Sequence, residues 1–128
     1  MTDRYSRKAL DYFLNPRNAR EMADPSGQGR AINAFSDVVT IHITVEKDLI
    51  QEATFQAQGC AACIATASVA TEMMTGKPLD YALSLDVETL SETLDDGIPT
   101  QKLERALVTP TAIRVAVDDY RERSGHEG

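Results

Sequence analysis

The two cysteines of this chain, Cys60 and Cys63, stand in a C-x-x-C spacing inside the stretch QGCAACI. A cysteine thiolate can ligate a metal ion, attack as a nucleophile or form a disulfide. The alternating apolar pattern before the pair gives way to a helical period after it. Both thiols are therefore expected at a helix N-terminus, whose free N–H groups favour the thiolate. The spacing alone leaves three interpretations open: a metal or cluster site, a redox or sulfur-transfer pair, and two small buried side chains.

Few other residues could complete a metal site. A closed zinc site needs four ligands, yet there is no second C-x-x-C motif, and the only histidines are His42 and His126. His42 falls on the outer, solvent-facing side of an expected strand and His126 lies in the tail, so neither is favoured as a ligand. Asp37 opens the same strand, where it is either a turn carboxylate or an oxygen ligand beside the cysteines.

The surroundings of the pair exclude one further chemistry and count against another. A zinc deaminase carries a His-x-Glu motif as well as its cysteines, and the stretch His42-Ile43-Thr44 lacks the glutamate. A thioredoxin-like pair is expected in a βαβ unit. The strands before Cys60 are instead expected to be antiparallel, which counts against that assignment.

The elements that position these residues follow from hydrophobic periodicity. Residues 38–45 and 50–58 alternate apolar and polar side chains around a short polar link, which predicts an antiparallel hairpin. After Gly59 the period becomes helical as far as Gly76, a typical residue for a helix end. We further expect an edge strand near residues 30–34 and helices at residues 4–14, 78–85, 86–94 and 109–123.

The last of these helices is expected to begin with Thr109 as its N-cap. Its buried face is predicted to consist of Ala112, Val115, Ala116 and Tyr120. Strands grouped before most of the helices predict a single α+β domain over residues 1–128. In that fold, helices pack on one face of an antiparallel three-stranded sheet.

The charge and composition exclude some classes of partner. The chain has 128 residues and a net charge of −7, and without a basic stripe to release counterions it is not expected to bind nucleic acid. The N-terminus lacks an apolar signal segment, and no apolar run approaches the roughly 18 residues of a membrane helix. We therefore expect no membrane association and a cytoplasmic location, where cysteines are free thiols by default.

Five segments of the chain share one resemblance. In chain order they are YSRKALDYFLNPRNA, SDVVTIHITV, FQAQGCAACIATAS, TGKPLDYAL and AIRVAVDDYR. Together they resemble the IscU/NifU-type iron–sulfur cluster assembly scaffolds. The resemblance runs from about Tyr5 to Arg121 and implies an α+β sandwich. It also implies a site in which three cysteines, an aspartate and a histidine hold a nascent [2Fe–2S] cluster or a zinc ion. The resemblance further implies that a cysteine desulfurase supplies the sulfur and that the finished cluster passes to an apo-acceptor protein.

Only part of that ligand set is present. The family aspartate falls on Asp37 and the second family cysteine on Cys60. The first family cysteine falls on Phe35, with Ser36 where the glycine would be. Cys63 is an additional thiol at a position where the family usually has a small residue.

The His-Cys pair of the family falls on Glu104-Arg105. Arg105 could keep Cys60 as a thiolate, or both residues could simply belong to a solvated helix surface. Glu104 could serve as a fourth, oxygen ligand. An oxygen-rich set of this kind suits zinc or ferrous iron.

The resemblance therefore implies a divergent scaffold that is not an enzyme. It would bind iron, zinc or a labile [2Fe–2S] cluster through Cys60, Cys63 and Asp37, with Glu104 as the fourth ligand, and pass it on. Two alternatives stay open: a SufE-like sulfur acceptor that carries a persulfide on Cys60, and a degenerate scaffold that only binds partner proteins. The oligomeric state is also open, including a dimer that shares one cluster.

Overall fold

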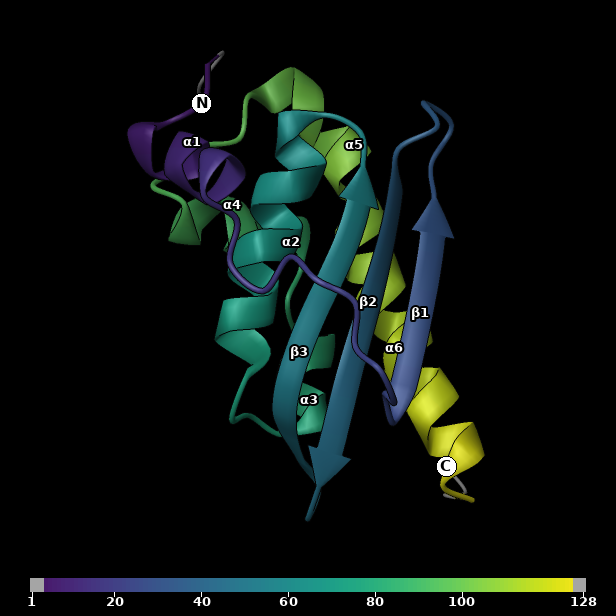
Figure 1. Cartoon of the computed structure of the whole chain (residues 1–128). Coiled ribbons are helices and arrows are strands. Elements are labelled where there is room, and N and C mark those ends of the chain that lie inside the picture. The colour runs from purple at the N-terminus through teal and green to yellow at the C-terminus, as the bar shows by residue number, and fades with distance from the viewer. Residues whose placement is uncertain (1–3, 126–128) are drawn as a thin grey trace.

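The computed structural model describes residues 4–125 as a three-stranded sheet covered by helices (Figure 1). This confirms the predicted α+β class and the antiparallel three-stranded sheet. Within this range every helix is too short or too polar to cross a bilayer. In chain order the elements are α1 (Arg7–Leu14), β1 (Gly27–Ile32), β2 (Val38–Glu46), β3 (Leu49–Gln58), α2 (Ala61–Met74), α3 (Leu79–Leu83), α4 (Val87–Thr93), the 3-10 turn η1 (Thr100–Lys102), α5 (Leu103–Ala106) and α6 (Val108–Arg123).

The sheet has the order β1-β2-β3, and both neighbouring pairs are antiparallel. Val39, Ile41 and Ile43 of β2 are fully buried, as their alternation predicts. The β2–β3 hairpin closes through Lys47 and Asp48, whose φ angles are 55° and 64°. Two consecutive left-handed residues suit a two-residue turn that follows the twist of the strands. The turn thereby helps to set the register of β3 against β2.

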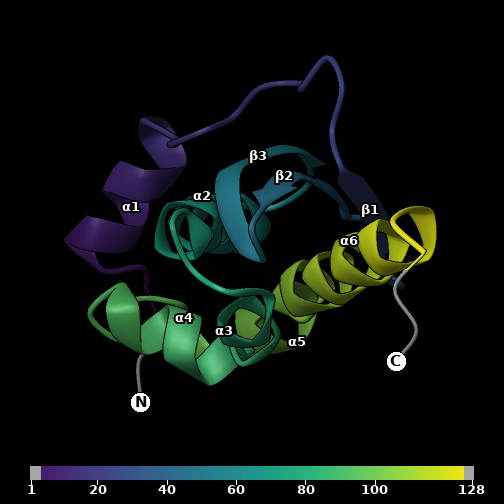
Figure 2. The same ribbon diagram turned by 90° about the horizontal axis from the view of Figure 1, so that it is seen from below.

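Helices α2 and α6 cover one face of the sheet, α2 against β3 and α6 against β1 and β2 (Figure 2). Helix α1 packs against α2 on the side away from β3. Helix α2 is thus enclosed on most sides, and Ala65, Ala67, Ser68 and Ala70 are completely buried. Small side chains let this helix approach its neighbours closely without leaving voids.

The other face of the sheet is crossed by the segment between α1 and β1 (Figure 1). The carbonyl of Asn18 accepts a hydrogen bond from the Phe55 N–H at 2.9 Å. Further along, the Ser26 hydroxyl accepts one from the Val45 N–H at 3.0 Å. The segment therefore covers part of the open edge of β3 and then joins β1 at the opposite edge.

His42 lies on this outer face, but it is buried, with 4% of its surface exposed. Its Nδ1 atom is 3.1 Å from Gln28 Oε1 and its Nε2 atom is 3.2 Å from Gln56 Oε1. The prediction of a solvated histidine was wrong because long side chains on both neighbouring strands enclose the ring. Strand alternation alone does not reveal such a lateral contact.

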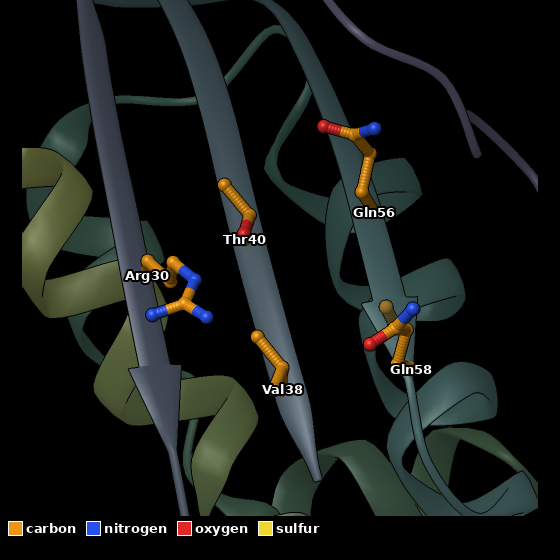
Figure 3. Close-up of a pocket in the computed structure, with 6 residues that line it drawn as sticks. Arg30, Val38, Thr40, Gln56 and Gln58 are labelled. Carbon is orange, nitrogen blue, oxygen red and sulfur yellow. The ribbon is translucent and has the colours of Figure 1, made fainter.

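Part of the outer face forms an open hollow of about 410 Å³ (Figure 3). The hollow extends across all three strands, because Thr40 of β2 is paired with Arg30 of β1 and with Gln56 of β3. Mostly polar side chains line it, unlike the apolar walls of typical small-molecule sites. The full lining is Arg30, Val38, Thr40, Gln56, Ala57 and Gln58.

The first strand begins earlier than the predicted residues 30–34. Gly27 and Gly29 occupy the positions of β1 that face α6, where an alternating pattern would show apolar side chains. A Cβ atom on Gly29 would lie 2.3 Å from the Ala112 carbonyl oxygen and from the Ala116 nitrogen. A periodicity analysis therefore misses this strand. Glycines stand where it expects apolar side chains, because the backbone of α6 occupies the space that those side chains would need.

The last helix differs from its prediction in two ways. It begins at Val108, so Thr109 lies inside the first turn and is not the N-cap, and its hydroxyl is 2.9 Å from that of Thr66. Val115 is 40% exposed, whereas Ile113 and Val117 are buried. The buried face therefore includes Ile113 and Val117 in place of Val115, because the helix meets α2 and α3 as well as the sheet.

The contact between β1 and α6 yields a testable prediction. Gly29→Ala is expected to lower the free energy of unfolding by about 1–3 kcal/mol, because its methyl group meets helix backbone that cannot yield. Urea unfolding followed by circular dichroism measures the change. The matched control is Arg30→Ala, an exposed neighbour on the opposite face, which is expected to leave stability nearly unchanged. Equal effects of the two substitutions would contradict this account of the packing.

Candidate metal centre

Three of the predicted site residues, Asp37, Cys60 and Cys63, meet at one end of the sheet. Their possible ligand atoms all lie within 4.8 Å of one another. The hairpin register explains the meeting, because the first residue of β2, Val38, is paired with the last residue of β3, Gln58. The residues just outside these two strand ends are therefore neighbours in space.

The two thiols stand at the N-terminal end of α2. Cys60 is the N-cap residue and Cys63 lies in the first turn, a spacing that puts both on the same side of the helix. Their Sγ atoms are 3.6 Å apart and both cysteines are free. Cys60 is partly exposed, whereas Cys63 is completely buried. Burial, followed by the neighbouring Cys60, raises the pKa of the Cys63 thiol.

The carboxylate of Asp37 is buried and surrounded by donors. The Arg105 guanidinium donates from Nε to Oδ2 and from Nη2 to Oδ1, each at 2.7 Å. The Cys60 N–H reaches Oδ1 at 3.0 Å, and the Asn33 amide reaches Oδ2 at 2.8 Å. The bonds from Arg105 are the main cause that holds the pKa of Asp37 far below its usual range, against the opposing effect of burial. Asp37 is thus charged, and four hydrogen bonds occupy its lone pairs.

Gly59 allows the carboxylate to come this close. Its φ is +154°, and a Cβ atom there would lie 2.3 Å from Asp37 Oδ1. Any larger residue would push the carboxylate away from the N–H of Cys60. The glycine before the first cysteine is therefore required by the packing of the aspartate as well as by the turn.

Asn33 is a site residue that the sequence analysis missed. Its amide nitrogen also donates to the Arg105 carbonyl at 3.0 Å, and its Oδ1 accepts from the N–H groups of Phe35 and Asp37. It therefore fixes the β1–β2 loop and connects it to α5. The available signal was an asparagine at the start of a short loop, since such side chains commonly hydrogen-bond the following backbone.

The remaining candidate ligands lie elsewhere. Glu104 is exposed on α5 and is not one of the three residues whose ligand atoms gather. His42 is engaged by two glutamines within the sheet. His126 lies outside the described residues.

Comparison with known proteins decides the family. The family model described as NifU-like N terminal domain matches residues 4–127. The chain belongs to the NifU-like N-terminal domain family. This confirms the resemblance found in the five segments.

Relatives of this NifU-like chain match over most of its length. It is 40% identical to iron-sulfur cluster assembly scaffold protein IscU 1 of Archaeoglobus fulgidus, over 94% of this chain and 79% of the relative. For IscU of Aquifex aeolicus the identity is 38%, over 98% of this chain and 81% of the relative. For IscU of Azotobacter vinelandii it is 35%, over 94% and 97%.

Solved structures share the fold of this NifU-like chain. The N-terminal part of a NifU-like protein from Brucella abortus matches with a TM-score of 0.76 at 15% identity, covering 94% of this chain and 96% of that one. A protein from Fervidobacterium islandicum, described as a scaffold for the SUF system, matches with a TM-score of 0.73 at 19% identity. The match covers 88% of this chain and 96% of that protein. At these identities the likeness concerns the fold alone.

Two positions where the resemblance expects cysteines, Phe35 and Arg105, lie in contact with each other. The Phe35 ring, where the resemblance expects a cysteine, lies 4.9 Å from the guanidinium carbon of Arg105. Ser36 stands where the resemblance expects a glycine, and its φ of 67° is left-handed. The backbone of the loop therefore has a conformation that glycine adopts most readily.

The ion pair at this site should dominate local stability. Asp37→Asn is expected to lower the free energy of unfolding by about 3 kcal/mol, because it leaves the partly buried Arg105 without its counter-charge. Asp80→Asn is the control, since Asp80 is 93% exposed and its ion pair with Arg121 is long, at 3.5 Å. Chemical denaturation at neutral pH compares the two. A loss no larger for Asp37→Asn than for Asp80→Asn would refute the importance of the pair.

The same carboxylate predicts a pH dependence. Its pKa is lower in the folded than in the unfolded state, so its contribution is complete above an unfolded pKa of about 3.9 and is lost as the pH falls below that value. The stability difference between wild type and Asp37→Asn is therefore expected to narrow between neutral pH and about pH 3. Denaturant titrations across this range test the sign. A gap that stays constant or widens on acidification would rule out the assigned role.

Proposed function

We propose that this chain is an IscU-type iron–sulfur cluster assembly scaffold. It binds iron, zinc or a labile [2Fe–2S] cluster through Cys60, Cys63 and Asp37 and passes the cargo to an acceptor protein. The cargo is a substrate of the site and not a resident cofactor. We expect residues 1–128 to act as one domain in this role.

The distance between the two thiols carries the proposal. Two sulfurs bound to one tetrahedral metal at about 2.3 Å each would be about 3.8 Å apart. The observed separation of 3.6 Å is close to this value, so little movement is needed to close on a metal ion. Metal binding deprotonates both thiols, and at the buried Cys63 this has to overcome the raised pKa of the thiol.

The third ligand, Asp37, becomes available only by exchange. Both of its oxygens already accept two hydrogen bonds, including the paired bonds from Arg105. A metal ion would have to displace this guanidinium, which is 23% exposed in its side chain and so has a path outward. Two thiolates and one exchangeable carboxylate make an open site, which suits a cargo that is held briefly.

Protein partners are also part of the proposal. A cysteine desulfurase would supply sulfur and apo-proteins would accept the product. In support, three large exposed apolar side chains lie within two residues of a site residue in the sequence: Ile32 at 55%, Phe35 at 51% and Leu107 at 50%. Exposed apolar side chains beside a site are typical of surfaces that meet other proteins.

The proposal is tested by anaerobic reconstitution. Wild type is expected to retain about one metal ion per chain with zinc, or a sulfide-containing chromophore with ferrous iron and sulfide. Cys60→Ser and Cys63→Ser are each expected to lose this binding, because each removes one of only two thiolates. Metal analysis after gel filtration and the absorption spectrum provide the readouts.

His42→Gln serves as the matched control for reconstitution. It removes a metal-binding side chain that is held by glutamines away from the thiols, so metal uptake should stay at the wild-type level. Binding that survives in both cysteine variants, or that disappears in His42→Gln, would reject the proposed ligand set. Wild type that retains no metal at all would favour a degenerate scaffold.

Arg105 is predicted to weaken metal binding by competing for Asp37. Arg105→Cys removes the competitor and adds a thiolate at the position where the resemblance expects one, so its zinc affinity is expected to rise about tenfold or more. Arg105→Gln removes only the charge and should give a smaller gain. Competition with a chromophoric zinc chelator measures both affinities. An affinity of Arg105→Cys at or below the wild-type value would contradict the competition.

A further inference from the structure

The thiol pair can carry out a sulfur reaction as well as ligation. We propose that Cys60 accepts sulfur as a persulfide and that Cys63 then releases it as sulfide by closing a disulfide with Cys60. The inference rests on the proposed function in one respect, that this site receives sulfur. It adds a resolving role for Cys63, the thiol at a position where the resemblance expects a small residue.

The separation of the sulfurs permits this step. A disulfide joins its sulfurs at about 2.05 Å, so the observed 3.6 Å has to shorten by a modest movement of the side chains. The two residues lie three apart at the start of α2, on the same side of the helix. Closure therefore needs no rearrangement of the helix as a whole.

The different exposure of the two thiols assigns their roles. Cys60 is partly exposed, so a persulfide donor on another molecule can reach it. Cys63 is completely buried, and its Sγ atom contacts the Arg105 carbonyl oxygen at 3.7 Å. It is thereby shielded from an external donor while remaining in contact with Cys60. Attack from the buried side leaves the outer sulfur free to depart toward solvent.

The carboxylate next to the thiols is occupied by other groups. Asp37 is fully engaged by Arg105, Asn33 and a backbone N–H, so it does not ligate while these bonds stand. The contact between the two sulfurs is therefore undisturbed by the carboxylate, and Cys60 and Cys63 are placed to react with each other.

The reaction balances in two steps. A persulfide donor RS–SH transfers its outer sulfur to the Cys60 thiolate, which gives the Cys60 persulfide anion and RSH. The Cys63 sulfur then bonds to Cys60 Sγ and the sulfur–sulfur bond of the persulfide breaks. The Cys63 thiol proton leaves on the departing sulfur as HS⁻. The two cysteine sulfurs are oxidised to a disulfide and the transferred sulfur is reduced to sulfide.

The product state has a consequence for the order of events. While the disulfide stands, neither cysteine offers a thiolate ligand, so sulfide release and metal ligation exclude each other in time. A dithiol reductant restores the pair by thiol–disulfide exchange. The same two residues thus supply sulfide first and ligands afterwards.

The test uses the reduced, metal-free chain of residues 1–128 and one equivalent of cysteine persulfide under anaerobic conditions. Wild type is expected to release about one equivalent of sulfide per chain and to become lighter by two hydrogen atoms, as a disulfide requires. Cys63→Ala is expected to keep one added sulfur atom on Cys60 and to release no sulfide above the protein-free blank. Cys60→Ala should do neither. Sulfide assays and intact mass spectrometry give the two readouts.

Several results would overturn the proposal. These are a wild-type chain that keeps the added sulfur, a Cys63→Ala variant that releases as much sulfide as wild type, and a Cys60→Ala variant that does so. Cys63→Ser provides a second variant, and circular dichroism checks the fold of each. Zinc uptake by the same wild-type sample is measured separately. Sulfide release without zinc uptake supports the thiol reaction alone, and zinc uptake without sulfide release supports metal binding alone.

Discussion

The buried carboxylate of Asp37 is the group on which the cysteine end of the molecule depends. It accepts four hydrogen bonds that come from three separate parts of the chain: the β1–β2 loop, the start of α2, and α5. A buried charge without such partners would be strongly unfavourable. The requirement to satisfy it therefore holds the loop, the helix N-terminus and α5 together, and with them the two thiols.

Much of the fold could be predicted because its signals are local. The β2–β3 hairpin and α2 follow from alternation and helical period within single segments, and these segments bring Asp37 and Cys60 to one end of the sheet. What escaped prediction depends on contacts between distant segments. The start of β1 could not be predicted from alternation, because two of its buried positions are Gly27 and Gly29, against which α6 packs directly. The burial of His42 depends on side chains of two other strands.

At the site, too, contacts between distant segments could not be predicted. Asp37, Cys60 and Cys63 could be proposed from residue type and spacing, and they do gather. The pairing of Asp37 with Arg105 could not, because 68 residues separate the two and no periodic pattern joins them. The sequence left Arg105 as either a cation near Cys60 or a solvated residue. The contact with Asp37 makes it the counter-charge of the carboxylate, and Asn33 supports both partners.

The residues that differ from what the resemblance expects lie against one another. Phe35 and Arg105, the two positions where the resemblance expects cysteines, are in contact with each other. Arg105 also donates two hydrogen bonds to the Asp37 carboxylate. Thiolates and a carboxylate in one site repel one another unless a cation neutralises part of their charge. Here the cation is part of the chain and the aromatic ring lies over it. The carboxylate is therefore neutralised without metal, and the free energy of binding must include the cost of displacing the guanidinium. Such a site would hold metal less firmly than one with the full ligand set, while its paired thiols keep their own reactivity.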